Sequence, residues 1–189
     1  MNDLIRSFIA VKIPSGSEDR LRAAEEQLRA AEASVKWVDP DSFHITLRFL
    51  GEVEEARLSA LWGSVYQSLD GSLSFTMRFL GVGAFPNIKR PRVIWAGVTE
   101  GAEEMRELAA RVEQACAGHG FEAEERPFRA HLTLGRVRRP ESNVKLAAAM
   151  AELSDAELGE VHVDRVVLMK SELTRSGAVY HILEERPLG

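Results

Sequence analysis

The sequence predicts an α+β protein of two pseudo-symmetric lobes, each an antiparallel sheet with outer helices. Three observations support this prediction. Strand-like and helix-like patterns alternate along the chain. A His-x-Thr unit occurs on a strand pattern twice, at His44 and at His131. The elements around the two units follow the same order, as expected of an internal repeat that places the two His strands along a central cleft.

The first half of the chain begins with a predicted strand at 7–13, which Pro14 ends. Polar residues at 15–19 offer N-cap chemistry for a helix over about 18–33, which has an apolar stripe. The remaining elements of this half are a short strand at 35–38, a turn at 39–42, the first His strand at 43–51, a helix at 54–69 and a strand at 73–82.

A loop at 85–92, with two prolines and three basic residues, separates the halves. The second half then predicts strands at 93–98 and 121–125, the second His strand at 128–137, further strands at 161–170 and 178–183, and helices at 102–117 and 143–153. We therefore interpret residues 1–189 as a single bilobal domain, with an internal repeat of roughly 7–84 and 92–170 followed by a C-terminal strand at 178–183.

The spacing of the elements supports the repeat. Ile9 precedes His44 by 35 residues, and Ile94, in the corresponding strand, precedes His131 by 37. Phe75, in the next long strand, follows the first histidine by 31 residues, and Val163 follows the second by 32. A chance pair of motifs would not bring the neighbouring elements into register. We expect a pseudo-twofold axis to bring the two His strands together around the cleft.

Composition narrows the class of protein. The chain has 189 residues, of which 45% are hydrophobic and 28% charged, as in ordinary soluble globular proteins. The net charge of −5 means that a nucleic-acid contact must use a local basic patch. The single cysteine, Cys116, fits a reducing compartment, and no early apolar run suits a signal peptide or membrane span. We expect a cytoplasmic monomer with no membrane partner.

The two His-x-Thr units carry residues suited to acid–base chemistry. In the first unit, alternation places Ile45, Leu47 and Phe49 on one face and His44, Thr46 and Arg48 on the other. Two imidazoles that face one bound group can act as acid and base, which typically accelerates a reaction roughly 10²–10⁴-fold. The hydroxyls of Thr46 and Thr133 can donate to the oxygens of an anionic group. This arrangement suits in-line attack at phosphorus.

Basic residues around the units favour phosphate as the bound group. Arg48 follows the first unit, and the second is surrounded by Arg129, Arg136, Arg138 and Arg139. No carboxylate or cysteine stands at ligand spacing beside either histidine. We expect a phosphoesterase that uses no metal and no cofactor.

The motifs resemble those of a known family. The paired HITL and HLTL are similar to the two signatures of the 2H phosphoesterase superfamily. The stretches SFIAV, KWVDPDSFHITLRFLG, RVIWAGV and LMKSEL resemble its RNA 2′,3′-cyclic phosphodiesterase branch, long called 2′-5′ RNA ligase. The similarity covers nearly the whole chain.

The resemblance implies hydrolysis of RNA 2′,3′-cyclic phosphate ends, tRNA fragments among them, to 2′-phosphomonoesters. It implies that His44 is the proton donor and His131 the acceptor, with minor reversible 2′-5′ ligation; the residues alone do not decide between the histidines. Arg136 matches a basic family position that contacts phosphate, provided that a bulge at Gly135 turns it toward His131. Phe8 matches a family aromatic near the base of the ligand.

Other interpretations stay open at this point. The His-x-Thr units could be ordinary strand residues, although the register of the repeat argues against this. The protein could be a 2H phosphodiesterase that acts on a small cyclic nucleotide. Assays that compare short RNA with mononucleotide substrates would distinguish such an enzyme from one that acts on RNA. It could also be a non-catalytic module that binds RNA ends, in which case binding would saturate without product.

Overall fold

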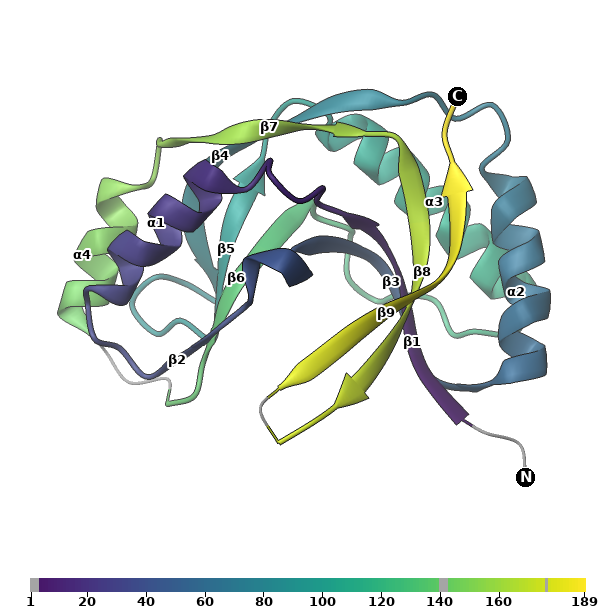
Figure 1. Ribbon diagram of the computed structural model, residues 1–189, viewed down its shortest axis with the longest axis horizontal. Coiled ribbons are helices and arrows are strands. Elements are labelled where there is room, and N and C mark those ends of the chain that lie inside the picture. Colours follow the sequence, from purple (N-terminus) through teal and green to yellow (C-terminus); the bar gives the residue numbers. More distant parts are fainter. Residues whose placement is uncertain (1–3, 140–142, 176) are drawn as a thin grey trace.

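Two antiparallel sheets form the frame of the protein in the computed structural model, which describes residues 4–139, 143–175 and 177–189 (Figure 1). The first sheet has the spatial order β3 (His44–Glu54), β1 (Leu4–Lys12), β8 (Arg165–Leu173) and β9 (Ala178–Pro187). The second has the order β2 (Val35–Trp37), β6 (His131–Val137), β5 (Val93–Val98), β4 (Phe75–Phe85) and β7 (Glu157–Val163). The predicted α+β class with two antiparallel sheets is confirmed.

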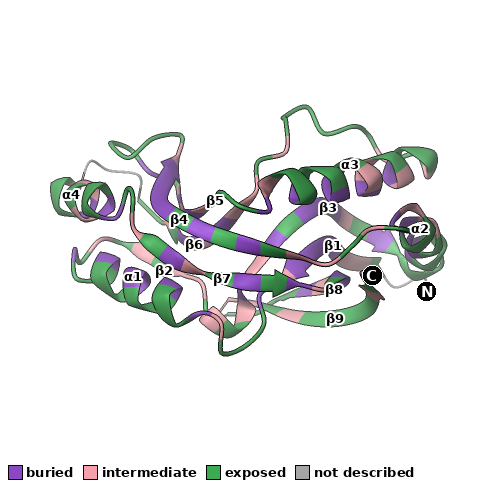
Figure 2. Cartoon of the chain, turned by 90° about the horizontal axis from the view of Figure 1, so that it is seen from above, coloured by how far each residue is buried: buried purple, intermediate pink, exposed green. Residues whose placement is uncertain are grey.

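Helices cover the sheets at opposite ends of the molecule (Figures 1 and 2). The helices α1 (Asp19–Arg29) and α4 (Val144–Glu152) contact each other and pack on the second sheet, at β7 and β4 respectively. The helices α2 (Glu55–Ser68) and α3 (Ala102–Gly118) pack together and against β3 of the first sheet. No helix in the described ranges is long and apolar enough to cross a membrane.

Each sheet contains strands from both halves of the sequence. β4 comes from the first half but lies beside β5, whereas β8 comes from the second half and lies beside β1. The helices cross over in the same way, because α1 follows β1 yet packs on the second sheet. The two lobes therefore do not coincide with residues 7–84 and 92–170, and the internal repeat itself stays a prediction.

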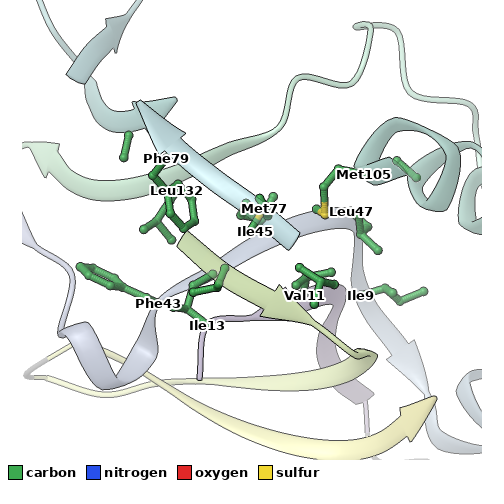
Figure 3. Close-up of a cluster of buried hydrophobic side chains, with 14 of the residues drawn as sticks. Ile9, Val11, Ile13, Phe43, Ile45, Leu47, Met77, Phe79, Met105 and Leu132 are labelled. Atoms are coloured by element: carbon green, nitrogen blue, oxygen red, sulfur yellow. The ribbon is translucent and has the colours of Figure 1, made fainter. Parts of the chain in front are cut away.

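The apolar backs of the two His strands are buried in one hydrophobic core. Ile45 and Leu47 of β3, and Leu132 and Leu134 of β6, are buried in the same cluster. Figure 3 shows three of these side chains among others from β1, β4 and α3. Burial of one such side chain is worth about 1.5–3 kcal/mol, so the core sets which face of each strand remains available to a ligand.

Two predicted strands are wrong. The single strand predicted at 161–170 is two strands, β7 and β8, which meet at Asp164. The strand predicted at 121–125 does not form, and this segment is irregular. Its backbone instead finds side-chain partners, because the carbonyl of Glu122 accepts from Arg48 and the amide of Glu124 donates to the Glu113 carboxylate at 3.0 Å.

A bulge in β3 reverses the predicted alternation after Thr46. Ala10 lies opposite Thr46 and Ile9 lies opposite Arg48, so Leu47 is an extra residue in the ladder. Arg48 consequently turns to the buried side, where 6% of it is exposed, and Phe49 is 43% exposed. The prediction that Arg48 shares the face of His44 is wrong for this reason.

Arg48 instead joins β3 to α3 and to the irregular segment. Its guanidinium pairs with Glu113 at 3.2 Å and Glu124 at 2.8 Å. Its charge also lies near Cys116, but burial is the larger effect and raises the pKa of that thiol to about 11. The thiol therefore stays protonated at neutral pH, as expected of a packing residue.

Replacement of Arg48 should destabilise the fold. We expect Arg48→Met to lower the free energy of unfolding by about 1–3 kcal/mol, because the variant loses the hydrogen bond to the Glu122 carbonyl and the two ion pairs of a buried guanidinium. Arg78→Met is a matched control, since Arg78 also pairs with two glutamates, Glu100 and Glu160, but on the surface. Its effect should stay below about 1 kcal/mol. If urea unfolding gave the same loss of unfolding free energy for Arg48→Met and Arg78→Met, the result would contradict the structural role of Arg48.

Candidate active site

His44 is held at one ring nitrogen by the turn that precedes β3. A single 3₁₀ turn at Pro40–Ser42 leads into the strand, and the Asp39 side chain caps it by accepting from the Asp41 amide. The Nδ1 of His44 lies 2.8 Å from the Ser42 carbonyl oxygen. Because a carbonyl only accepts, Nδ1 must carry the proton of this bond. The neutral ring therefore has its lone pair at Nε2.

His131 repeats this arrangement at the start of β6. Its Nδ1 lies 2.7 Å from the carbonyl oxygen of Arg129, also two residues earlier in the chain. The same argument assigns the proton to Nδ1 and the lone pair to Nε2. The two motifs thus present chemically equivalent imidazoles, each with Nε2 available for proton transfer.

Aromatic rings wall both imidazoles. Phe8 lies 4.8 Å from the His44 ring, and Tyr180 of β9 meets the same ring edge-on at 5.0 Å. Phe85 meets His131 edge-on at 5.1 Å. Phe8 is only 3% exposed, so it packs beside His44 and has little free ring surface. Tyr180 and Phe85 were not predicted from the sequence, because neither lies in a recognisable motif.

A bulge in β6 turns Arg136 toward the face of His131. Trp95 lies opposite Thr133 and Ile94 lies opposite Gly135, so Leu134 is the extra residue. This confirms the predicted bulge. A Cβ at residue 135 would lie 2.6 Å from the Val35 side chain and 2.8 Å from that of Trp37, so glycine lets β2 pack closely there.

The electrostatics of the site link the two histidines. Burial lowers the pKa of His44 and of His131, while the carbonyl hydrogen bond of each ring opposes this change. The positive charge of Arg136 lowers the pKa of both imidazoles further. One cation therefore acts on both rings, and β3 contacts β6 although they belong to different sheets. The two His strands therefore lie close together, and the charge of Arg136 acts on both rings.

The remaining predicted residues divide into two groups. Thr46 is exposed and Thr133 half-buried, and the strand registers place each on the face of its histidine. The side chain of Arg129 lines a cavity beside His131, whereas Arg48 lies in the ion cluster with Glu113 and Glu124. In the part of the chain that the structure describes, no three His, Cys, Asp or Glu side chains form a group that could hold a metal ion.

Two imidazoles that each present Nε2, with the charge of Arg136 acting on both, suit an anion that gains one proton and gives up another as it reacts. Comparison with known proteins agrees with this chemistry. Residues 13–175 match the family model of the 2′-5′ RNA ligase superfamily. The chain belongs to this superfamily.

Members of the superfamily with similar sequences and folds cover nearly the whole chain. The RNA 2′,3′-cyclic phosphodiesterase of Methanothermobacter thermautotrophicus is 37% identical over 180 residues, which are 95% of this chain and 97% of that protein. The enzyme of the same name from Aeropyrum pernix is 37% identical, over 88% and 93% of the two chains.

Solved structures share the fold. A crystal structure of a Thermus thermophilus protein has a TM-score of 0.81 and 29% identity, and covers 97% of this chain and 98% of that one. Escherichia coli LigT, crystallised with 3′-AMP, has a TM-score of 0.73 and 24% identity, with coverage of 98% and 99%. The latter likeness bears on the fold alone.

Arg136→Gln should raise the pKa of both histidines, because it removes a cation that depresses both. In an NMR titration of the ligand-free protein we expect the pKa of each imidazole to lie below the ordinary value of 6.5. In the variant both pKa values should be higher than in wild type. Arg138→Gln removes the same charge two residues further along and should change both values less. A shift confined to one histidine would contradict a shared site.

Proposed function

We propose that this protein hydrolyses the 2′,3′-cyclic phosphate at RNA ends to a 2′-phosphomonoester without a metal. The observation that carries the proposal is the pair of Nδ1-anchored imidazoles, on two strands that contact each other. The family and the names of similar proteins support RNA cyclic phosphates as the substrate class.

The geometry supports an in-line displacement with one histidine on each side of phosphorus. The Nε2 of His131 takes a proton from water, whose oxygen forms the new bond to phosphorus. The bond from phosphorus to the 3′ oxygen breaks, and the Nε2 of protonated His44 donates a proton to that oxygen. The 2′ ester bond remains. Proton exchange with solvent then returns both rings to their starting states.

Three side chains would hold the phosphoryl oxygens during this displacement. Thr46 and Thr133 lie two residues beyond the histidines on the same faces, where their hydroxyls can donate to non-bridging oxygens. Arg136 supplies a positive charge near both rings, which stabilises the charge that develops on phosphorus oxygens. A 5′-hydroxyl in place of water would give minor 2′-5′ ligation by the same steps.

Loss of either histidine should abolish most of the hydrolysis. We expect His44→Asn and His131→Asn each to reduce turnover by roughly 10²–10⁴-fold, the usual contribution of a general acid or base. His162→Asn, at an exposed position on β7, is the control and should keep the wild-type rate. The assay uses short RNA with a 2′,3′-cyclic phosphate in the presence of a chelator, and identifies the product end.

A 2′-phosphate product, formed in chelator, is the expected result. A 3′-phosphate would reverse the proposed leaving oxygen, and activity that zinc or magnesium restores after chelation would contradict metal independence. Turnover of mononucleotides but not RNA would favour a small-nucleotide phosphodiesterase. Saturable binding without any product would favour a module that only binds RNA ends.

The pH dependence of kcat/KM should be bell-shaped with its maximum below about pH 6.5. Catalysis needs His131 neutral and His44 protonated, and the site lowers the pKa of both rings in the free protein. A lowered pKa means that His44 loses its proton at lower pH, so kcat/KM falls as pH rises through neutrality. Bound phosphate should raise both pKa values and move the kcat profile to higher pH. A kcat/KM maximum above pH 7.5 would contradict these shifts.

A further inference from the structure

A cavity that His131 lines has further walls that the proposed hydrolysis does not use. Its volume is about 260 Å³, slightly below the roughly 300–1,000 Å³ of typical ligand pockets. Its walls come from the end of β4, from β5, from the first turns of α3 and from the segment before β6. The side chains that matter here are Phe85, Trp95, Arg106, Phe128, Arg129 and His131. The size suits one nucleoside better than a length of strand.

The cavity lies on the reactive face of the second sheet. Gly97, which lines it, is directly opposite His131 in the register of β5 and β6, and neighbours across a ladder share a face. A Cβ at residue 97 would come within 2.7 Å of the Leu80 carbonyl oxygen. Glycine therefore fits this tight backbone approach and leaves the wall beside His131 without a side chain.

Aromatic rings make up much of the cavity wall. Phe85, Trp95 and Phe128 are all half-buried and so keep part of their surface exposed. Phe85 lies 5.3 Å from the Trp95 ring and also contacts His131. The Trp95 indole rests on Gly83, where a Cβ would come within 2.3 Å of the ring. Partly exposed aromatic rings are the surfaces on which nucleobases stack.

The charged residues of the cavity favour an anionic ligand. Arg106 of α3 and Arg129 both line it and are exposed, whereas none of the described lining residues is acidic. Arg106 pairs with Glu103, which does not line the cavity. A ligand with an aromatic base and a phosphate matches these walls, because arginine binds phosphate oxygens well.

The position of the cavity relative to the histidines indicates which nucleoside it takes. In the proposed mechanism the leaving 3′ oxygen is on the side of His44, and the attacking oxygen is on the side of His131. A nucleoside beside His131 is therefore the one that brings the attacking oxygen. We propose that this cavity binds the 5′-hydroxyl nucleoside of a second RNA end and makes it the acceptor in 2′-5′ ligation, an inference that rests on the proposed function.

The ligation step balances without any co-reactant. The 5′ oxygen forms a bond to phosphorus, its proton passes to Nε2 of His131, and the bond from phosphorus to the 3′ oxygen breaks. His44 gives its proton to that 3′ oxygen. The cyclic phosphate therefore becomes a 2′-5′ diester. Opening of the strained cyclic ester drives this step, as it drives the hydrolysis.

The experiment measures how the reaction divides between ligation and hydrolysis. RNA with a 2′,3′-cyclic phosphate is incubated with increasing concentrations of RNA that has a 5′-hydroxyl. The ligated share should saturate with acceptor, and an acceptor with an abasic 5′-terminal nucleotide should need about 10-fold more to reach half-saturation, within the range expected for loss of one stacked base. Phe128→Ala and, separately, Trp95→Leu should have an effect of similar size with the intact acceptor.

Tyr66→Leu is the matched control, because Tyr66 is an exposed aromatic residue on α2 and does not line the cavity. It should leave the ligated share unchanged. The inference is overturned if ligation rises linearly with acceptor, if the abasic acceptor performs equally well, or if the cavity variants only raise KM for a mononucleoside cyclic phosphate. The last result would place the terminal base of the donor in the cavity.

Direct binding separates failure of this inference from failure of the proposed function. If the protein does not hydrolyse cyclic phosphates, the proposed function fails, and titration with a dinucleotide that has a 5′-hydroxyl still examines the cavity. Binding is followed by the quenching of tryptophan fluorescence. A dissociation constant that Phe128→Ala raises about 10-fold supports a nucleoside site. Binding that is equal in the variant and in wild type overturns it.

Discussion

The site depends on two short hydrogen bonds, in which Nδ1 of His44 and Nδ1 of His131 each donate to a backbone carbonyl two residues earlier. Each bond decides that Nδ1 carries the proton of the neutral ring and leaves the lone pair at Nε2. Each also resists loss of the proton, while burial and Arg136 favour the neutral ring. The proposed catalysis needs the two rings in different protonation states, with His44 protonated and His131 neutral.

Paired bulges give the site its asymmetry. Both His strands carry an extra residue just after the Thr. Because of this bulge, the residue three positions after each Thr lies on the same face as the histidine. In β6 this residue is Arg136, whereas in β3 it is the exposed Phe49. Arg6 lies over the Phe49 ring at 4.7 Å. The equivalent positions of the two strands therefore carry a cation in β6 and an aromatic ring in β3.

The sequence predicted the features that depend on local pattern. Both His strands, the helices that follow them and the bulge at Gly135 could be inferred from periodicity and from a glycine beside a motif. The burial of Arg48 could not, because no glycine marks the bulge at Leu47 and the partners of Arg48 lie more than sixty residues further on, in α3 and the segment after it. Tyr180 was missed for the same reason, since only the pairing of β8 with both β1 and β9 brings it to His44.

The exchange of strands between lobes was equally invisible in the local pattern. After the first His strand, the next strand, β4, joins the other sheet. After the second His strand, the next strand, β7, stays in the same sheet. Long-range packing decides between these outcomes, and the spacing of the elements does not encode it. As a result, the lobes share a core in which β1, β3, β4 and β6 all bury side chains (Figure 3). This shared core gives a physical reason for the two imidazoles to keep a constant relation to each other.

In the proposed mechanism His44 donates a proton and His131 accepts one, and a change of leaving atom distinguishes these two roles. A cyclic substrate with sulfur in place of the bridging 3′ oxygen has a leaving group that needs no proton. The account predicts that His44→Ala regains most of its lost activity on this substrate and that His131→Ala does not, because attack by water still needs a base. Rescue of His131→Ala alone would contradict the assignment of acid and base, and rescue of neither would contradict proton donation to the 3′ position.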